Sequence, residues 1–171
     1  VSSILKSLKT LFLSKQVWLS GLYVGTMYCT FNTIAALWGI PYLQKIYGIS
    51  KFHASEINSL IFLGAIIGYP LFGWLTSKFQ AYHKRMIIIA ATAAMVDVLL
   101  ICFVVHTVYM VSALFFMLGV FAGSTSTATT IAKESMPVSI SGLTMSVVNT
   151  LLVLVGALSQ PLFGYLLDFD Q

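Results

Sequence analysis

Five long apolar stretches constrain this chain more than any other feature of its sequence. Each one reaches the roughly 20 residues that a helix needs to cross a hydrocarbon core about 30 Å thick. The stretches are residues 17–43, 57–75, 86–105, 108–131 and 143–167. Unpaired backbone groups find no water inside a bilayer, so these segments should be helices. We therefore predict an all-α fold, a polytopic membrane bundle with five transmembrane helices over residues 16–171.

The composition agrees with a membrane protein. Hydrophobic residues make up 58% of the chain and charged residues only 8%, which is too few to cover a soluble domain of this size. The net charge of +4 does not indicate nucleic-acid binding, because the nine Lys and Arg are scattered between apolar runs. Cys29 and Cys102 lie within apolar stretches, so we expect no disulfide, no metal site and no cofactor.

Residues 1–15 precede the first span and have the pattern of a short amphipathic helix. Five apolar side chains recur there at helical spacing, with lysines between them: Ile4, Leu5, Leu8, Leu11 and Phe12. We expect a linker that lies in the cytoplasmic interface and continues a preceding segment of a longer protein. The first span is longer than a straight crossing needs and carries Pro41 near its end, which predicts a tilt, a kink or a projecting turn.

The positive charges predict the orientation of the spans. Seven of the nine Lys and Arg fall on one side of the five crossings: Lys6, Lys9, Lys15, Lys78, Lys84, Arg85 and Lys133. Only Lys45 and Lys51 fall on the other side. Cytoplasmic loops carry the excess of Lys and Arg in membrane proteins. We therefore expect the N-terminal end of the chain in the cytoplasm and the C-terminal end outside.

A phrase that occurs twice predicts an internal repeat. Residues 64–74 read GAIIGYPLFGW, and residues 156–165 read GALSQPLFGY. The matching positions Gly73 and Gly164 enclose the end of one span, two whole spans and the start of another, so the repeat unit is about three helices. An odd number of helices predicts copies of inverted topology, as in secondary transporters. It also predicts a sixth helix beyond Gln171.

Two motifs resemble a known family. The segment Gly73-Trp-Leu-Thr-Ser77-Lys78-Phe79, followed by His83-Lys84-Arg85, is similar to that family's loop of a glycine, an acidic residue and a basic cluster, with Ser77 in place of the usual Asp. The segment Gln160-Pro161-Leu-Phe-Gly164-Tyr-Leu-Leu-Asp168, with Pro137, Gly142 and Asn149 before it, is similar to the family's eleventh helix and its approach loop. From residue 17 onward the chain resembles the C-terminal half of a major facilitator superfamily transporter, without its last helix.

The resemblance implies a secondary active transporter that moves a small solute by alternating access. The implied partners are the solute, a co-transported ion that we expect to be a proton, the N-terminal half of the same transporter and the lipid bilayer. We expect a multi-pass protein of a bacterial inner (cytoplasmic) membrane. No Lys or Arg lies inside a span, which favours a neutral, zwitterionic or cationic solute.

Two classes other than a transporter are possible for a membrane helix bundle. An intramembrane enzyme is disfavoured, because the chain has no HExxH, no GxSxG and no set of catalytic groups at one membrane depth. A receptor, sensor or channel on the same scaffold stays the alternative, because a fold does not fix a function.

The resemblance also selects substrate-binding candidates. In that family the first, second, fourth and fifth helices of each half surround a central cavity. The polar side chains on those helices that we assign to substrate binding are Tyr28, Asn32, Asn149 and Gln160. They share helix faces with small residues, so the alternative is that these stripes are only packing seams.

Asp97 is the only ionisable group well inside a span. An intramembrane acid is a candidate for proton coupling. The third helix of each half is peripheral in the resembling family, which favours instead a structural acid that bonds a neighbouring helix. Both interpretations stay open at this point.

Several other residues are candidates for roles in conformational change, in interface anchoring or in gating. Gly64, Gly68 and Pro70 are possible points of flexing in the second span, and Gly73, Lys78, Lys84 and Arg85 belong to the loop motif that follows it. Trp38 and Tyr42 lie near a span end, where they anchor the interface or gate the outer mouth. We expect the three histidines on solvated loop surfaces: His53, His83 and His106.

Overall fold

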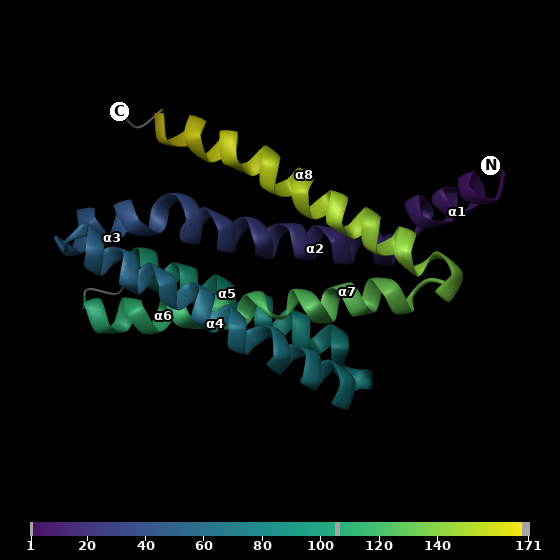
Figure 1. Cartoon of the computed structure of the whole chain (residues 1–171), viewed down its shortest axis with the longest axis horizontal. Helices are drawn as coiled ribbons and strands as arrows, with labels where there is room; N and C mark the ends of the chain where they lie inside the picture. Colours follow the sequence, from purple (N-terminus) through teal and green to yellow (C-terminus); the bar gives the residue numbers. More distant parts are fainter. Residues whose placement is uncertain (1, 105–106, 169–171) are drawn as a thin grey trace. The chain divides into compact units, whose positions relative to one another are not determined.

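All regular structure in the described part of the chain is helical (Figure 1). The computed structural model describes the backbone of residues 2–104 and 107–168 and the side chains of residues 8–104 and 107–161. The elements, in chain order, are α1 (Ser2–Leu13), α2 (Lys15–Asn32), η1 (Thr33–Trp38), α3 (Gly39–Tyr47), α4 (Lys51–Lys78), η2 (Gln80–Tyr82), α5 (His83–Phe103), α6 (Val108–Ala122), α7 (Thr125–Glu134), η3 (Val138–Ile140) and α8 (Ser141–Asp168). The predicted all-α class is confirmed for these residues.

Four segments of the described chain are long and apolar enough to cross a membrane. They are Lys51–Lys78, Gln80–Phe103, Val108–Glu134 and Val138–Pro161, and they overlap the last four predicted spans. The helical stretch over the first predicted span is not among them, because its Ser, Thr, Tyr and Asn side chains lower its mean hydropathy. The count of five transmembrane helices and the inverted repeat therefore stay predictions.

The first predicted span is irregular in its middle, before Pro41. There α2 passes into the π-helix η1, in which the backbone N–H of Gly39 donates to the carbonyl oxygen of Ile34 rather than to that of Ala35. The carbonyl oxygen of Ala35 accepts instead from Nδ2 of Asn58 on α4, at 2.7 Å. One extra residue is thus accommodated in the helix because a buried amide from its neighbour pairs the carbonyl that the insertion frees.

The chain divides into two compact units, which we call the continuous unit (Thr30–Thr127) and the discontinuous unit (Val1–Cys29 with Ala128–Gln171). In the continuous unit α4 and α6 lie side by side in direct backbone contact. A Cβ atom at Gly64 would overlap the carbonyl oxygen of Phe116, and one at Gly119 would overlap that of Ile61. Glycine on both helices therefore permits an approach that no larger residue would allow.

Polar contacts connect the helices of the continuous unit at both ends. At one end the hydroxyl of Tyr42 on α3 donates to the carbonyl oxygen of Ile101 on α5, at 2.6 Å. At the other end the Oγ1 atoms of Thr76 on α4 and Thr127 on α7 lie 2.7 Å apart and share a hydrogen bond. Nε2 of His83 donates to the carbonyl oxygen of Thr76, at 2.8 Å. The start of α5 is thereby attached to the end of α4.

In the discontinuous unit α2 lies against α8 (Figure 1). Gly21 faces the side chain of Leu151, and Gly25 faces that of Val155. Farther along, Sγ of Cys29 lies 2.8 Å from Oγ of Ser159. These contacts define what we call the α2–α8 seam. Unlike the α4–α6 contact, it places glycines of one helix against side chains of the other.

Candidate functional site

One of the four predicted substrate-binding residues, Tyr28, packs at the α2–α8 seam, and two others, Asn149 and Gln160, lie on α8. The ring of Tyr28 packs over Gly156, where a Cβ atom would stand 3.6 Å from its Cε1 atom. Asn149 and Gln160 are exposed, and their spacing of 11 residues puts them on the same face of α8 as Gly156, about three turns apart. The ring of Tyr28 and these two amides are among the polar side chains of α2 and α8. Such groups can donate and accept hydrogen bonds to a polar solute.

The fourth predicted residue, Asn32, lies in the continuous unit. It is the last residue of α2, and its side chain is half-buried. It stands directly before η1, where the helix changes its hydrogen-bond pattern. Its grouping with Tyr28 rests on their spacing of one helical turn along α2 and stays a prediction.

Asp97 lies where α5 meets α6, within the continuous unit. Its side chain is only 4% exposed, and its Oδ2 atom is buried without a hydrogen-bond partner among the described residues. Asp97 borders a groove of about 520 Å³ between the two helices, which is otherwise lined almost entirely by apolar side chains such as Ile89, Val96 and Phe121. A proton-coupling role and a structural role for Asp97 both stay predictions.

The candidate flexing residues of α4 differ in their surroundings. Gly64 and Gly68 are buried against the backbone of α6, and a Cβ atom at Gly68 would overlap the carbonyl oxygen of Val120. Pro70 is exposed within α4 and has no N–H to donate to the preceding turn. Gly73 has open space where a Cβ atom would be. Close packing thus occupies the first two positions, whereas the last two are free of it.

The basic residues after α4 contact aromatic rings. Nζ of Lys78 lies 4.7 Å from the ring centre of Trp74, and the guanidinium carbon of Arg85 lies 5.4 Å from that of Tyr82. Lys84 is exposed. Among the described residues none of these three cations is in an ion pair. The loop therefore holds two of its charges by cation–π contacts, which are worth about 0.5–1 kcal/mol at exposed sites.

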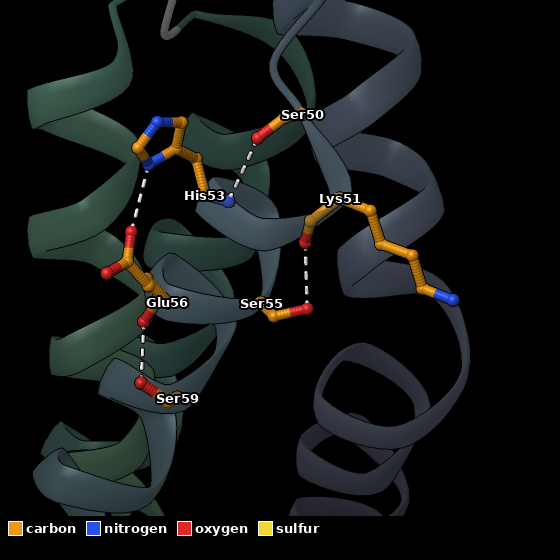
Figure 2. A network of polar contacts seen from close by, with 6 residues as sticks. All are labelled: Ser50, Lys51, His53, Ser55, Glu56 and Ser59. Atoms are coloured by element: carbon orange, nitrogen blue, oxygen red, sulfur yellow. Dashed lines mark hydrogen bonds and ion pairs between the residues drawn. The ribbon is translucent and has the colours of Figure 1, made fainter.

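The prediction that all three histidines lie on solvated loops is wrong for His83. Its side chain is 6% exposed at the start of α5, because the short helix η2 turns the ring back onto the end of α4. His53 is exposed as expected, but it lies in the first turn of α4 rather than in a loop. Figure 2 shows its N–H donating to Oγ of Ser50 and its Nδ1 atom 2.9 Å from Oε2 of Glu56. His106 lies outside the described residues.

Sequence reasoning missed Asn58. This amide is 5% exposed, and it is the group that pairs the free carbonyl oxygen of the π-helix. Its Oδ1 atom is buried without a partner in the described part of the chain. The available signal was an amide in an apolar span, the same signal that selected Asn32 and Asn149.

The two aromatic residues near the end of the first predicted span differ in their contacts and exposure. Trp38, at the end of η1, is 43% exposed. Tyr42 is held by its hydrogen bond to Ile101, so its hydroxyl attaches α3 to α5. Interface anchoring and gating of an outer mouth both stay predictions for this pair.

Comparison with known proteins gives one family match. A family model described as Major Facilitator Superfamily matches residues 20–170. No curated protein and no solved structure gives a significant match. The matched residues include the helices of the α2–α8 seam and both helices that border the groove at Asp97.

Proposed function

Because this chain belongs to the Major Facilitator Superfamily, we propose that it is part of a secondary active transporter that moves a small solute by alternating access, driven by a proton gradient. Members of this family are generally membrane transporters rather than enzymes. The match supports an integral membrane protein that acts on a small solute. The coupling ion, the solute class and the residues below are our proposal.

The observation that carries the proposal is the polar content of the α2–α8 seam. Polar side chains inside membrane helices are costly to leave without partners, so they face a bundle interior or a water-filled path. The phenol of Tyr28 packs over Gly156 of α8, and the exposed amides of Asn149 and Gln160 share a helix face with Gly156. We assign them, together with Asn32, to solute binding. Amides and hydroxyls suit a neutral, zwitterionic or cationic solute better than an anion, because they bring no fixed positive charge.

We assign the coupling proton to Asp97. No other acid lies well inside a span, and its buried Oδ2 atom has no partner among the described residues. A carboxyl group in such surroundings can alternate between a protonated and an ionised form as the groups around it change.

The conformational part of the proposal rests on the segment from Gly64 to Arg85. Rocking of this bundle against an N-terminal half would give alternating access, with flexing near Gly64, Gly68 and Pro70. Gly73 and the basic residues Lys78, Lys84 and Arg85 would lie on the cytoplasmic side, because that side carries most of the Lys and Arg of the chain. A bacterial inner membrane, with the N-terminal end of the chain in the cytoplasm, is the setting that we propose.

The test is uptake by the full-length transporter in proteoliposomes, with and without an imposed proton gradient. The panel contains amino acids, sugars, nucleosides and organic cations. We expect one class to accumulate only with the gradient. Asp97→Asn should abolish accumulation and leave equilibration of the solute intact. Accumulation that is untouched by Asp97→Asn would refute the coupling role, and absence of accumulation of every solute in the panel would contradict the transporter proposal in favour of a receptor or channel.

The seam is tested by a matched pair of neighbours. Asn149→Ala should raise the KM for the accumulated solute by roughly tenfold, the effect of one lost hydrogen bond to a ligand. Thr150→Val is the control, because the Thr150 hydroxyl is exposed and already donates to the carbonyl oxygen of Ser146 on its own helix. Equal KM values for the two variants would remove Asn149 from the solute site.

A further inference from the structure

The groove between α5 and α6 has the size of a small-molecule site. Its volume of about 520 Å³ lies in the range of about 300–1,000 Å³ that is typical of such sites. Apolar side chains from both helices form nearly all of its surface. They include Ile88, Ile89, Val96, Met117 and Phe121.

Asp97 is the exception to this apolar lining. It is 4% exposed, and its Oδ2 atom has no hydrogen-bond partner among the described residues. The described residues form a single ion pair, which joins His53 to Glu56 and does not involve Asp97. A buried carboxylate without a partner is energetically costly. A ligand in the groove that brings a positively charged donor to the carboxyl group of Asp97 would recover part of this cost.

The other polar group of the groove cannot satisfy Asp97. The Thr92 hydroxyl donates to the carbonyl oxygen of Ile88, at 2.9 Å, so its proton is already used within α5. The groove therefore offers hydrogen-bond acceptors and no free donor. A ligand must bring the donor itself, which excludes anions and favours an ammonium group.

The rim of the groove indicates how a ligand would enter. Ile88 is 63% exposed, Ile89 68% and Val96 46%, all on α5, and Met117 on α6 is 42% exposed. In a membrane-spanning pair of helices such large apolar surfaces face hydrocarbon. Access from the side, through the bilayer, suits a molecule with an apolar body, whereas a hydrophilic solute would not reach the groove by that route.

We propose that the groove binds a lipophilic amine that enters from the bilayer, with its ammonium group on the carboxylate of Asp97 and its apolar body along Ile89, Val96 and Phe121. The site lies wholly within the continuous unit and does not include the residues assigned to the solute path. A carboxyl group can hold either a proton or an ammonium group, so this site is compatible with the proposed coupling role. Its test requires neither transport nor a gradient.

The test measures binding to the full-length transporter in lipid nanodiscs. The probe is a dansyl-labelled long-chain primary amine, and the comparison ligand is the alcohol of the same chain length with the same label. Empty nanodiscs measure partition into lipid alone. We expect saturable binding of the amine, and binding of the alcohol that is roughly tenfold to a hundredfold weaker, because a bond to a charged group is lost.

Three variants separate the carboxylate from the groove. Asp97→Asn keeps the size of the side chain and should weaken amine binding to the level of the alcohol. Glu56→Gln removes an exposed acid elsewhere, with the same change in net charge, and should leave amine binding unchanged. Ala93→Phe fills the groove at a half-buried lining position and should abolish binding of both probes.

Two results would overturn the proposal: equal affinity of the wild-type protein for amine and alcohol, or undiminished amine binding by Asp97→Asn. Asp97→Asn removes a buried unpaired charge and should fold, and thermal unfolding of each variant verifies this. Because binding is measured without a solute or a gradient, failure of uptake in proteoliposomes leaves this result standing, and failure of amine binding leaves the transporter proposal standing.

Discussion

Asn58→Ala should destabilise the protein, because it leaves a carbonyl group of a different helix without its hydrogen-bond partner. The substitution removes the 2.7 Å hydrogen bond from Nδ2 to the carbonyl oxygen of Ala35. The helix cannot pair this oxygen, because the N–H of Gly39 is already bonded to Ile34. A buried carbonyl without a partner costs about 1–3 kcal/mol. Polar contacts between membrane helices average about 0.6 kcal/mol, because the unfolded chain in the membrane also finds partners.

The cost of the unpaired carbonyl group should exceed the average value for a polar contact between membrane helices, but one effect of the substitution reduces the loss. The Oδ1 atom of Asn58 is itself buried without a partner in the described part of the chain, and its removal recovers some of the loss. We therefore expect a decrease of about 1–2 kcal/mol in the free energy of unfolding. Asn58→Asp should cost more, because it replaces the donor with an acidic group that faces a carbonyl oxygen.

The assay is unfolding of the full-length protein by SDS titration in mixed micelles. Ser59→Ala is the control, because that neighbouring hydroxyl is exposed and donates only to Glu56 on its own helix. It should change stability by less than about 0.5 kcal/mol. If Asn58→Ala is as stable as Ser59→Ala, the π-helix has returned to an α-helix, the N–H of Gly39 has paired with Ala35, and the reasoning is refuted. Faster amide hydrogen exchange at Gly39 in Asn58→Ala than in the wild-type protein would support the reasoning.

Two further pairs of variants test the packing of the continuous unit by the same unfolding assay. Gly119→Ala should lower the free energy of unfolding by about 1–3 kcal/mol, because its Cβ atom would overlap a backbone carbonyl group of α4. The control Gly73→Ala has open space for a Cβ atom and should be neutral or raise the free energy of unfolding by up to about 1 kcal/mol. Equal effects of the two substitutions would contradict the close contact of α4 and α6. Thr127→Val should lower the free energy of unfolding by about 1 kcal/mol, because its hydrogen bond to Thr76 is lost. The exposed control Thr92→Val should leave the free energy of unfolding almost unchanged. A larger loss for Thr92→Val than for Thr127→Val would show that the hydroxyl pair adds no stability.

The helical class and the small-residue faces could be predicted from the sequence, because both depend on local patterns. Length and hydropathy indicate membrane helices whatever their neighbours are. The spacing of Gly119 and Gly123 places them on one face, and the structure shows that face against α4.

The π-helix could not be predicted in this way. It depends on a donor that comes from another helix, and neither Ala35 nor Asn58 has a local pattern that indicates the pairing. The tilt, kink or projecting turn predicted from Pro41 stays a prediction, and Pro41 itself lies in α3, after the π-helix.

The surroundings of the polar candidates were equally beyond the sequence. Burial of His83 depends on the turn η2, which brings its ring to the carbonyl oxygen of Thr76. The sequence shows that Asp97 lies well inside a predicted span, but the groove beside it depends on where α6 packs. Sequence periodicity identifies the face of a helix, whereas a site needs the second surface that meets this face.

The two glycine contacts of this fold have different mechanical consequences. Between α4 and α6, glycines of each helix meet the backbone of the other, so sliding would drive carbonyl groups against Cα atoms. Between α2 and α8, Gly21 and Gly25 meet the side chains of Leu151 and Val155, which can change rotamer. Flexing near Gly64 or Gly68 would therefore have to carry α6 along with α4. In the α2–α8 seam, where Tyr28 lies, side chains form most of these contacts, and the carbonyl oxygen of Leu151 near Gly25 adds a backbone contact. Side-chain rotation can therefore relieve much of the seam's packing, which is consistent with the proposed role of Tyr28 in solute binding.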